Sequence, residues 1–170
     1  MLLGLVPVVL IAIVVFSNIR VAPVSSGDNL KYTGVACIYI DDRLVECNHN
    51  IITNNGKDLI KKGMMGIAQV RLNQIAVANR TTPLSESDIS LQGEWVSCGM
   101  ERATGTLTDL GVGNWSISYQ WKSTCDDVVV NATGIYDSIS GTLFAEAVFN
   151  RVAILQTNEK INITYYTWIN

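Results

Sequence analysis

The feature that most constrains this 170-residue chain is its first stretch, Leu2 to Ile19, which reads LLGLVPVVLIAIVVFSNI. From Leu2 to Phe16 no side chain is charged and none forms hydrogen bonds, and Arg20 ends the run. No stretch after residue 70 has a comparable apolar block. Because the run precedes a polar linker, the sequence predicts a targeting, anchoring or assembly segment outside the core of the folded domain.

Three interpretations of this segment stay open. A secretory signal peptide has an apolar core of about 7–15 residues, but this segment lacks a basic start and its best cleavage site lies before Gly27. A retained membrane helix usually needs about 20 apolar residues. The third interpretation is a hydrophobic arm that packs against copies of itself. All three place the remaining residues outside the cytoplasm.

Residues 34–170 are expected to form one domain, joined to segment 1–19 by a linker at 20–33. β-Branched and aromatic residues are plentiful there, and from Leu72 onward apolar and polar residues alternate with a period of two. Runs that recur every 8–12 residues between Gly- and Asn-rich turns are typical of antiparallel sandwiches. The sequence therefore predicts an all-β fold, an antiparallel immunoglobulin-like or jelly-roll-like β-sandwich with one short internal helix, preceded by an N-terminal hydrophobic helix or arm. The expected strands are a hairpin over 34–47 and runs at 49–53, 72–78, 94–98, 102–110, 115–122, 128–136, 142–149, 151–155 and 161–169.

The internal helix is expected over roughly 55–66. Asn54 or Asn55 can cap it, and apolar residues from Leu59 to Met65 have helical spacing. Gly63 and Gly66 keep it short. This helix is interpreted as a plug at one end of the β-domain.

Four cysteines are present, at positions 37, 47, 98 and 125, with no C-x-x-C spacing. An even number of cysteines in an exported protein favours disulfides. A three-residue turn at 41–43 would place Ile40 opposite Leu44 and Cys37 opposite Cys47, at a distance that a disulfide spans. A Cys98–Cys125 bond then follows by elimination. Four buried thiols are the alternative.

The sequence contains few residues that could carry out catalysis. His49 is the only histidine and stands near Cys47, and the paired carboxylates at 41–42, 86/88 and 126–127 all fall in predicted turns. The formal charge is −3 without a basic stripe, which disfavours nucleic acid as a partner. We therefore expect no enzyme activity, no cofactor, no metal site and no nucleic-acid binding.

N-x-S/T sequons occur at four positions, Asn79, Asn114, Asn131 and Asn162. All lie near predicted strand ends or turns, so each is a candidate glycosylation site in an exported chain. The positions at 131 and 162 fall inside predicted strands.

The final run, Ile161 to Ile169, carries no charge and alternates cleanly. A strand at a free end can fill an open sheet edge in its own chain or in a neighbour's chain. The same holds for residues 20–40. The candidate assembly residues are therefore the apolar positions Leu5, Val8, Val9, Ile11, Ile13, Val15, Phe16, Ile161, Ile163 and Tyr165.

Several segments resemble known structural proteins. Residues 53–66 (TNNGKDLIKKGMMG), 74–78, 91–105 and 131–170 follow an order similar to that of small β-sandwich domains in tail and appendage proteins of bacterial and archaeal viruses. The apolar arm PVVLIAIVVF resembles the start of archaeal pilins, although it is shorter and shows no processing site. Extracellular archaeal filaments built from β-domains that exchange a strand are similar in architecture. These resemblances imply a repeated, surface-exposed structural protein.

The sequence thus predicts the subunit of an extracellular filament, assembled with copies of itself through its N-terminal segment, strand exchange, or both. One alternative is a virion structural protein of a tail or a viral membrane. Another is a cell-surface module, anchored in a membrane through residues 2–19, that binds a sugar or a protein.

Overall fold

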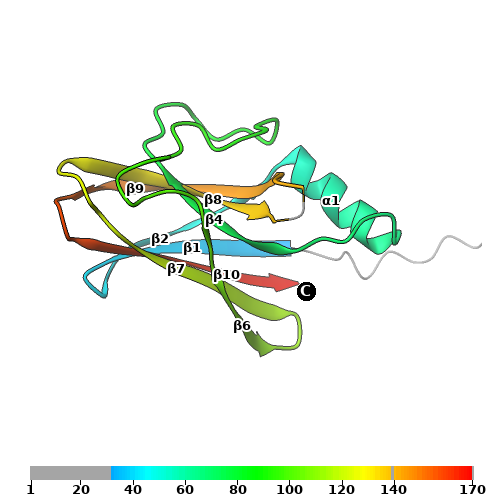
Figure 1. Cartoon of the computed structure of the whole chain (residues 1–170). Coiled ribbons are helices and arrows are strands. Elements are labelled where there is room, and N and C mark those ends of the chain that lie inside the picture. The colour runs from blue at the N-terminus through cyan, green and yellow to red at the C-terminus, as the bar shows by residue number, and fades with distance from the viewer. Residues whose placement is uncertain (1–31, 139, 170) are drawn as a thin grey trace, which may run out of the picture.

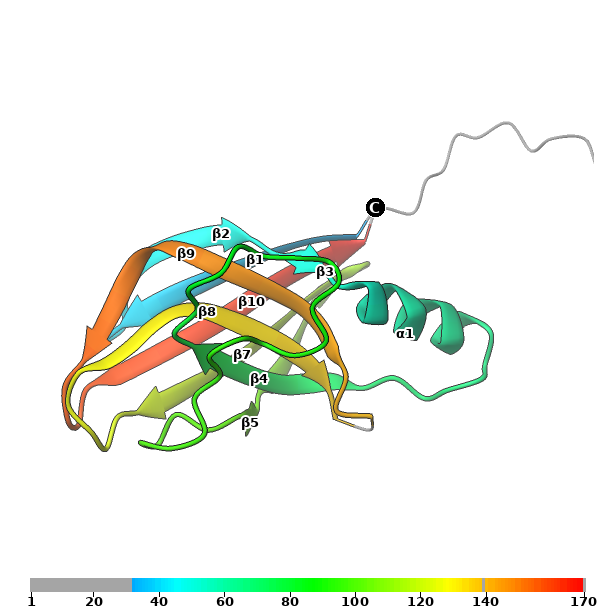
Figure 2. The same cartoon turned by 90° about the horizontal axis from the view of Figure 1, so that it is seen from above.

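The computed structural model describes residues 32–138 and 140–169, which form two packed antiparallel sheets and one short helix (Figures 1 and 2). The all-β sandwich expected from the alternation is confirmed. The segments 1–19 and 20–31 lie outside the described residues, as do seven candidate assembly residues, Leu5 to Phe16. Sheet A has the order β2 (Arg43–His49), β1 (Tyr32–Ile40), β10 (Lys160–Ile169), β7 (Asn114–Lys122) and β6 (Thr106–Gly111). Sheet B has the order β3 (Ile51–Ile52), β9 (Leu143–Leu155), β8 (Val128–Asp137), β4 (Leu72–Ala78) and β5 (Ala103–Thr104).

The main core lies between the two sheets, because every second residue of the central strands points inward. In β10 the inward residues Ile161, Ile163 and Tyr165 are fully buried. Opposite them in β7 lie Trp121, Tyr119 and Ile117. Burying a large apolar side chain contributes about 1.5–3 kcal/mol, so these residues are a main source of the stability of the domain.

The expected role of the last strand needs correction. β10 pairs with β1 along one side and with β7 along the other, so it is the central strand of sheet A. Ile161, Ile163 and Tyr165 are therefore core residues in this structure and do not line an open edge. Residues 32–40, the described part of the second candidate edge strand, also form an internal strand, β1. It starts at Tyr32, inside the expected linker.

The first hairpin has the expected disulfide but a tighter turn. The turn contains two residues, Asp41 and Asp42, and both have positive φ values (46° and 63°), as the turn type favoured in hairpins requires. Ile40 consequently faces Arg43 rather than Leu44. The register shifts between Ile38 and Tyr39, so that Cys37 again faces Cys47 and the two form a disulfide with Cα atoms 4.0 Å apart.

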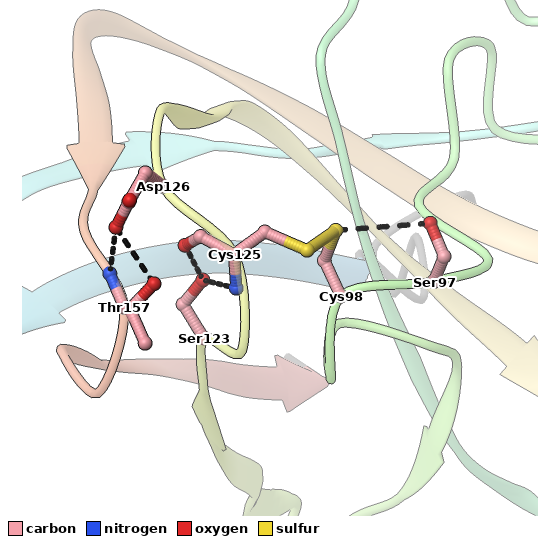
Figure 3. The surroundings of a disulfide bond; sticks show 6 residues. All are labelled: Ser97, Cys98, Ser123, Cys125, Asp126 and Thr157. Carbon is pink, nitrogen blue, oxygen red and sulfur yellow. Dashed lines mark hydrogen bonds between the residues drawn. A yellow bond between two sulfur atoms is a disulfide. The ribbon is translucent and has the colours of Figure 1, made fainter.

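Two chain crossings between the sheets share the end of the sandwich opposite the helix. The connections β7–β8 and β9–β10 both pass there (Figure 1). Asp126 in the first crossing accepts hydrogen bonds from the backbone N–H and the hydroxyl of Thr157 in the second, at 2.8 and 2.6 Å (Figure 3). The Cys98–Cys125 disulfide ties the long 79–102 connection to the same place, which confirms the second expected pair.

The helix α1 (Asn54–Met64) forms close to its expected position. Its N-cap is Thr53 rather than an asparagine, because the Thr53 hydroxyl accepts a hydrogen bond from the Gly56 N–H at 2.9 Å. A Cβ on Gly56 would lie 2.1 Å from the carbonyl oxygen of Phe144, so this helix can approach β9 only with glycine there. The helix thereby packs against one end of sheet B.

Four other strand predictions are wrong in detail. In the expected run 49–53, His49 is the last residue of β2 in sheet A, and only Ile51–Ile52 form a further strand, β3, which pairs with β9 in sheet B. The expected run 102–110 is divided between β5 in sheet B and β6 in sheet A. Residues 94–98 form a loop with one isolated bridge, between Ala78 and Glu94. The expected runs 142–149 and 151–155 form one continuous strand, β9.

Candidate assembly surface

An open apolar cavity of about 520 Å³ lies at the end of the sandwich where β1 begins and β10 ends. Both sheets, the helix and the connection from α1 to β4 contribute to it, and we call it the terminal slot. Its lining residues are Tyr32, Ile52, Lys57, Ile60, Val70, Leu72, Trp115, Phe144 and Ile169.

The wall of the slot formed by sheet B and the helix is a packed cluster. Leu59 and Phe144 are buried at its centre. Tyr32 packs against Phe144 in an edge-to-face arrangement with ring centroids 5.5 Å apart, a geometry that aromatic pairs favour. The opposite wall is formed by Trp115 and Ile169 of sheet A. The slot is thus a continuation of the hydrophobic core that is left open at one end.

Among the described residues that line the slot, Lys57 alone is charged, and it forms an ion pair with Glu86 at 2.6 Å. Both side chains are about half exposed, at 51% and 57%. The positive charge therefore stays in water at the rim with its counter-charge.

A second candidate surface is a layer of chain that covers the outer face of sheet B, and we call residues 79–102 the loop layer (Figures 1 and 2). It can approach the sheet closely because β4 and β8 present small residues there, and Leu91 packs onto Ala76, Ala78 and Ala132. At the side of β8, the Trp95 ring N–H donates to the carbonyl of Val129 at 2.7 Å.

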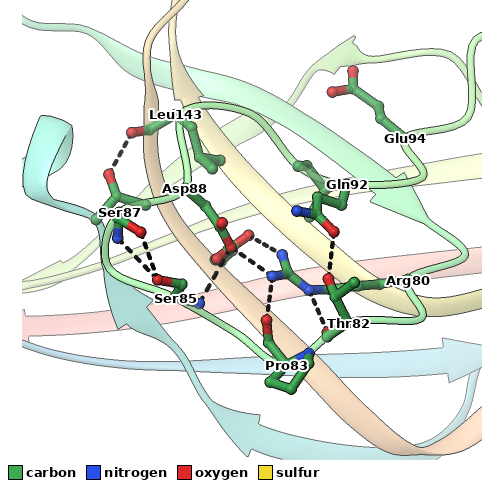
Figure 4. Close-up of polar contacts among 12 residues, drawn as sticks. Arg80, Thr82, Pro83, Ser85, Ser87, Asp88, Gln92, Glu94 and Leu143 are labelled. Atoms are coloured by element: carbon green, nitrogen blue, oxygen red, sulfur yellow. Dashed lines mark hydrogen bonds and ion pairs between the residues drawn. The ribbon is translucent and has the colours of Figure 1, made fainter.

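A buried ion cluster holds the start of the loop layer in place (Figure 4). The Arg80 guanidinium is 1% exposed and donates to Glu146 at 2.7 Å and to Asp88 at 2.5 Å. It also donates to the carbonyls of Thr82 and Pro83. The arginine thus closes the turn that follows it and pairs with two carboxylates on different segments.

The pKa values of the two carboxylates in this cluster are shifted in opposite directions. Burial raises the pKa of Glu146 to about 7, and the neighbouring Asp88 carboxylate adds to the effect, while Arg80 opposes it. Burial also tends to raise the pKa of Asp88, but hydrogen bonds from Arg80 and its positive charge hold that pKa below its usual range. At neutral pH the cluster therefore consists of an ionised Asp88, Arg80 and a partly protonated Glu146.

A third contact fixes the middle and end of the loop layer. The Tyr136 hydroxyl donates to Glu94 and accepts from the Leu91 N–H, each at 2.8 Å. Arg102 forms an ion pair with Glu94 and lies 3.4 Å from the centroid of the Tyr136 ring. Since the polar groups of this layer are largely engaged with one another, we interpret it as structural and not as a ligand site.

The candidate glycosylation sites differ in their accessibility. Asn79 and Asn114 are exposed, whereas Asn162 is half-buried within β10. The Nδ2 atom of Asn131, to which a glycan would be joined, donates to the Arg80 carbonyl at 2.8 Å, and its Oδ1 accepts from the Arg80 N–H. Glycosylation at Asn131 would therefore disrupt the start of the loop layer.

The remaining chemical groups noted in the sequence have structural partners or are exposed. Cys47 is bound in a disulfide, so it offers no thiol to His49. Asp127 accepts from the Gln156 side chain at 3.0 Å. Within residues 32–138 and 140–169, no three His, Cys, Asp or Glu side chains are grouped to hold a metal ion. In that same part of the chain, no helix has the length and apolar character needed to cross a membrane.

Sequence reasoning missed the terminal slot and the ion cluster. The slot combines residues from positions 32 to 169, so its formation depends on tertiary packing. A signal for a covered outer face did exist, because β4 and β8 carry Ala76, Ala78, Ala132 and Gly134 where a solvated face would carry polar residues.

Comparisons of the chain with protein-family models, with curated proteins and with solved structures gave no significant match. The resemblance to viral tail domains and archaeal filaments therefore stays a prediction from sequence patterns. The two disulfides by themselves indicate an oxidising, extracellular setting.

Proposed function

We propose that this chain is the subunit of an extracellular filament, in which the β-sandwich forms the body and the apolar N-terminal segment joins subunits. The proposal includes an immunoglobulin-like or jelly-roll-like classification of the sandwich and use of the exposed sequons at Asn79 and Asn114. Its partner is a further copy of the same chain.

The observation that carries the proposal is that one chain contains both a long apolar N-terminal segment and a disulfide-bonded β-sandwich. A run of fifteen apolar residues, 2–16, precedes a body stabilised by two disulfides. Each Val, Leu, Ile or Phe of that run would gain about 1.5–3 kcal/mol on full burial. A disulfide-stabilised body suits a subunit that must persist outside the cell.

The test is a charged substitution inside the run. Ile11→Asp should abolish filaments seen by negative-stain electron microscopy of sheared surface material, because a carboxylate opposes burial of the segment. Ile11→Leu is the matched control and should assemble like the wild-type chain. Both variants should retain the tryptophan fluorescence and both disulfides of the folded body. Filaments of normal number and length in Ile11→Asp, or none in the wild-type chain, would refute the proposal.

A further inference from the structure

We infer that the terminal slot binds the apolar segment 2–16 of a neighbouring copy of this chain. The inference rests on the proposed function and deepens it by naming the surface that receives the segment.

The apolar chemistry of the slot suits side chains of such a segment, and its volume admits part of the segment. Eight of the nine described residues that line it are aliphatic or aromatic, and its volume is about 520 Å³. This volume lies within the range of roughly 300–1,000 Å³ that is typical of binding pockets. An open apolar hollow continuous with the core favours a partner that covers it.

The charges point to the same class of occupant. Lys57 at the rim already has Glu86 as its counter-ion, so the described lining of the slot offers no unpaired charge to a polar ligand. The segment 2–16 brings no charged group and no hydrogen-bonding side chain. Apolar contacts alone would therefore hold it.

The slot lies at the end of the sandwich from which the N-terminal part of the chain departs. Tyr32, the first described residue, lines the slot, as does Ile169 near the chain end. Fifteen residues, 17–31, connect the apolar segment 2–16 to Tyr32. Fifteen extended residues reach at most about 50 Å.

This reach is enough to pass from one subunit to the next. β10 has ten residues, so the body is roughly 33 Å long in the strand direction. A segment on a tether of up to about 50 Å can enter the slot of a copy displaced by one body length in the same orientation. Repeated, this contact does not close and produces a filament, whereas reciprocal exchange between two copies would stop at a dimer.

The inference can be tested by cross-linking within the full-length protein. One chain carries the photoreactive residue p-benzoylphenylalanine in place of Val70, a half-buried slot residue. A second chain, co-expressed in the same cells, lacks the probe and carries Val9→Ile, which makes its segment one methylene heavier. After irradiation, mass spectrometry identifies the cross-linked peptides. We expect the probe to be joined both to segment peptides of ordinary mass and to the heavier segment peptides of the second chain.

A slot variant provides the second measurement. Ile60→Glu places a carboxylate in the slot and should lower the sedimenting, polymerised fraction by about tenfold or more. Val96→Glu, at a loop-layer position that is 79% exposed, is the matched control and should assemble normally. Thermal unfolding of both variants checks that the body stays folded, and if Ile60→Glu unfolds, the cross-linking result decides.

The outcomes separate the inference from the proposed function. If the probe is cross-linked only to segment peptides of ordinary mass, each segment fills the slot of its own chain, and the inference is overturned. Filaments without any probe–segment cross-link overturn it too, while the proposed function stands. Cross-links to both masses in a dimer without filaments support the slot contact and refute the filament. If no filaments form and no cross-links to the heavier segment are found, both the inference and the proposed function are refuted.

Discussion

Replacing Arg80 with methionine should destabilise the domain severely, and the structure allows the cost to be worked out. The guanidinium is the positive partner of Glu146, which is 0% exposed, and it donates to three further acceptors. Removing one partner of a buried ion pair typically costs about 3–5 kcal/mol, because the remaining charge is buried without compensation. Glu146 can escape part of this penalty by taking up a proton, since its pKa is already raised to about 7. We therefore expect about 3 kcal/mol at about pH 6 and a larger cost, toward about 5 kcal/mol, at about pH 8.

The assay is urea unfolding of the full chain followed by tryptophan fluorescence, at one protein concentration and at both pH values. Lys61→Met is the matched control, because Lys61 forms an exposed ion pair with Asp58 in α1 and its side chain is 64% exposed. Such exposed pairs contribute little to stability, because water and salt screen them. Adding Glu146→Gln to Arg80→Met should recover part of the loss, because no buried carboxylate is then left unpaired at position 146. An Arg80→Met cost no larger than that of Lys61→Met, or a cost independent of pH, would refute the role given to the cluster.

Three further predictions concern pH, disulfides and glycans. Because the pKa of Glu146 is raised, the folded state binds more protons than the unfolded state between about pH 4.5 and 7, and the free energy of unfolding should fall by up to about 3 kcal/mol as pH rises through that range. Urea midpoints of Glu146→Gln measured across the same range should not show this fall. An unchanged fall in the variant would assign the effect to another group. Removing the Cys98–Cys125 bond, whose cysteines are 27 residues apart, by double alanine substitution should lower the free energy of unfolding by about 3.5 kcal/mol in urea titrations; a loss under about 1 kcal/mol would show that the bond hardly restricts the unfolded chain. Peptide mass spectrometry of protein exported by a glycosylating host should find glycan on Asn114 and none on Asn131, and a fully occupied Asn131 would contradict its hydrogen bonds to Arg80.

Local sequence signals predict much of the fold. The β4 strand has the bounds expected from the sequence, and α1 lies within one to two residues of its expected position, because alternation and capping are local properties. Even the tighter 41–42 turn leaves the predicted Cys37–Cys47 pair intact, since the irregular register between Ile38 and Tyr39 compensates for the missing turn residue.

Tertiary packing determines the features that local signals could not predict. The last strand has no charge from Ile161 to Ile169 and reads as an edge strand, yet it lies at the centre of sheet A, because strand order depends on which surfaces pack together. Arg80 occurs in a polar stretch where a solvated arginine is the ordinary expectation. Its burial follows from Glu146, 66 residues away, and such a pair has no signature in a single sequence.

The most direct test of the account is the intact mass and the sedimentation of the protein recovered from the surface of cells that export it. The account predicts a mature chain that retains residues 2–16 and sediments as a polymer. A chain that begins near Gly27 and sediments as a single folded subunit would contradict it.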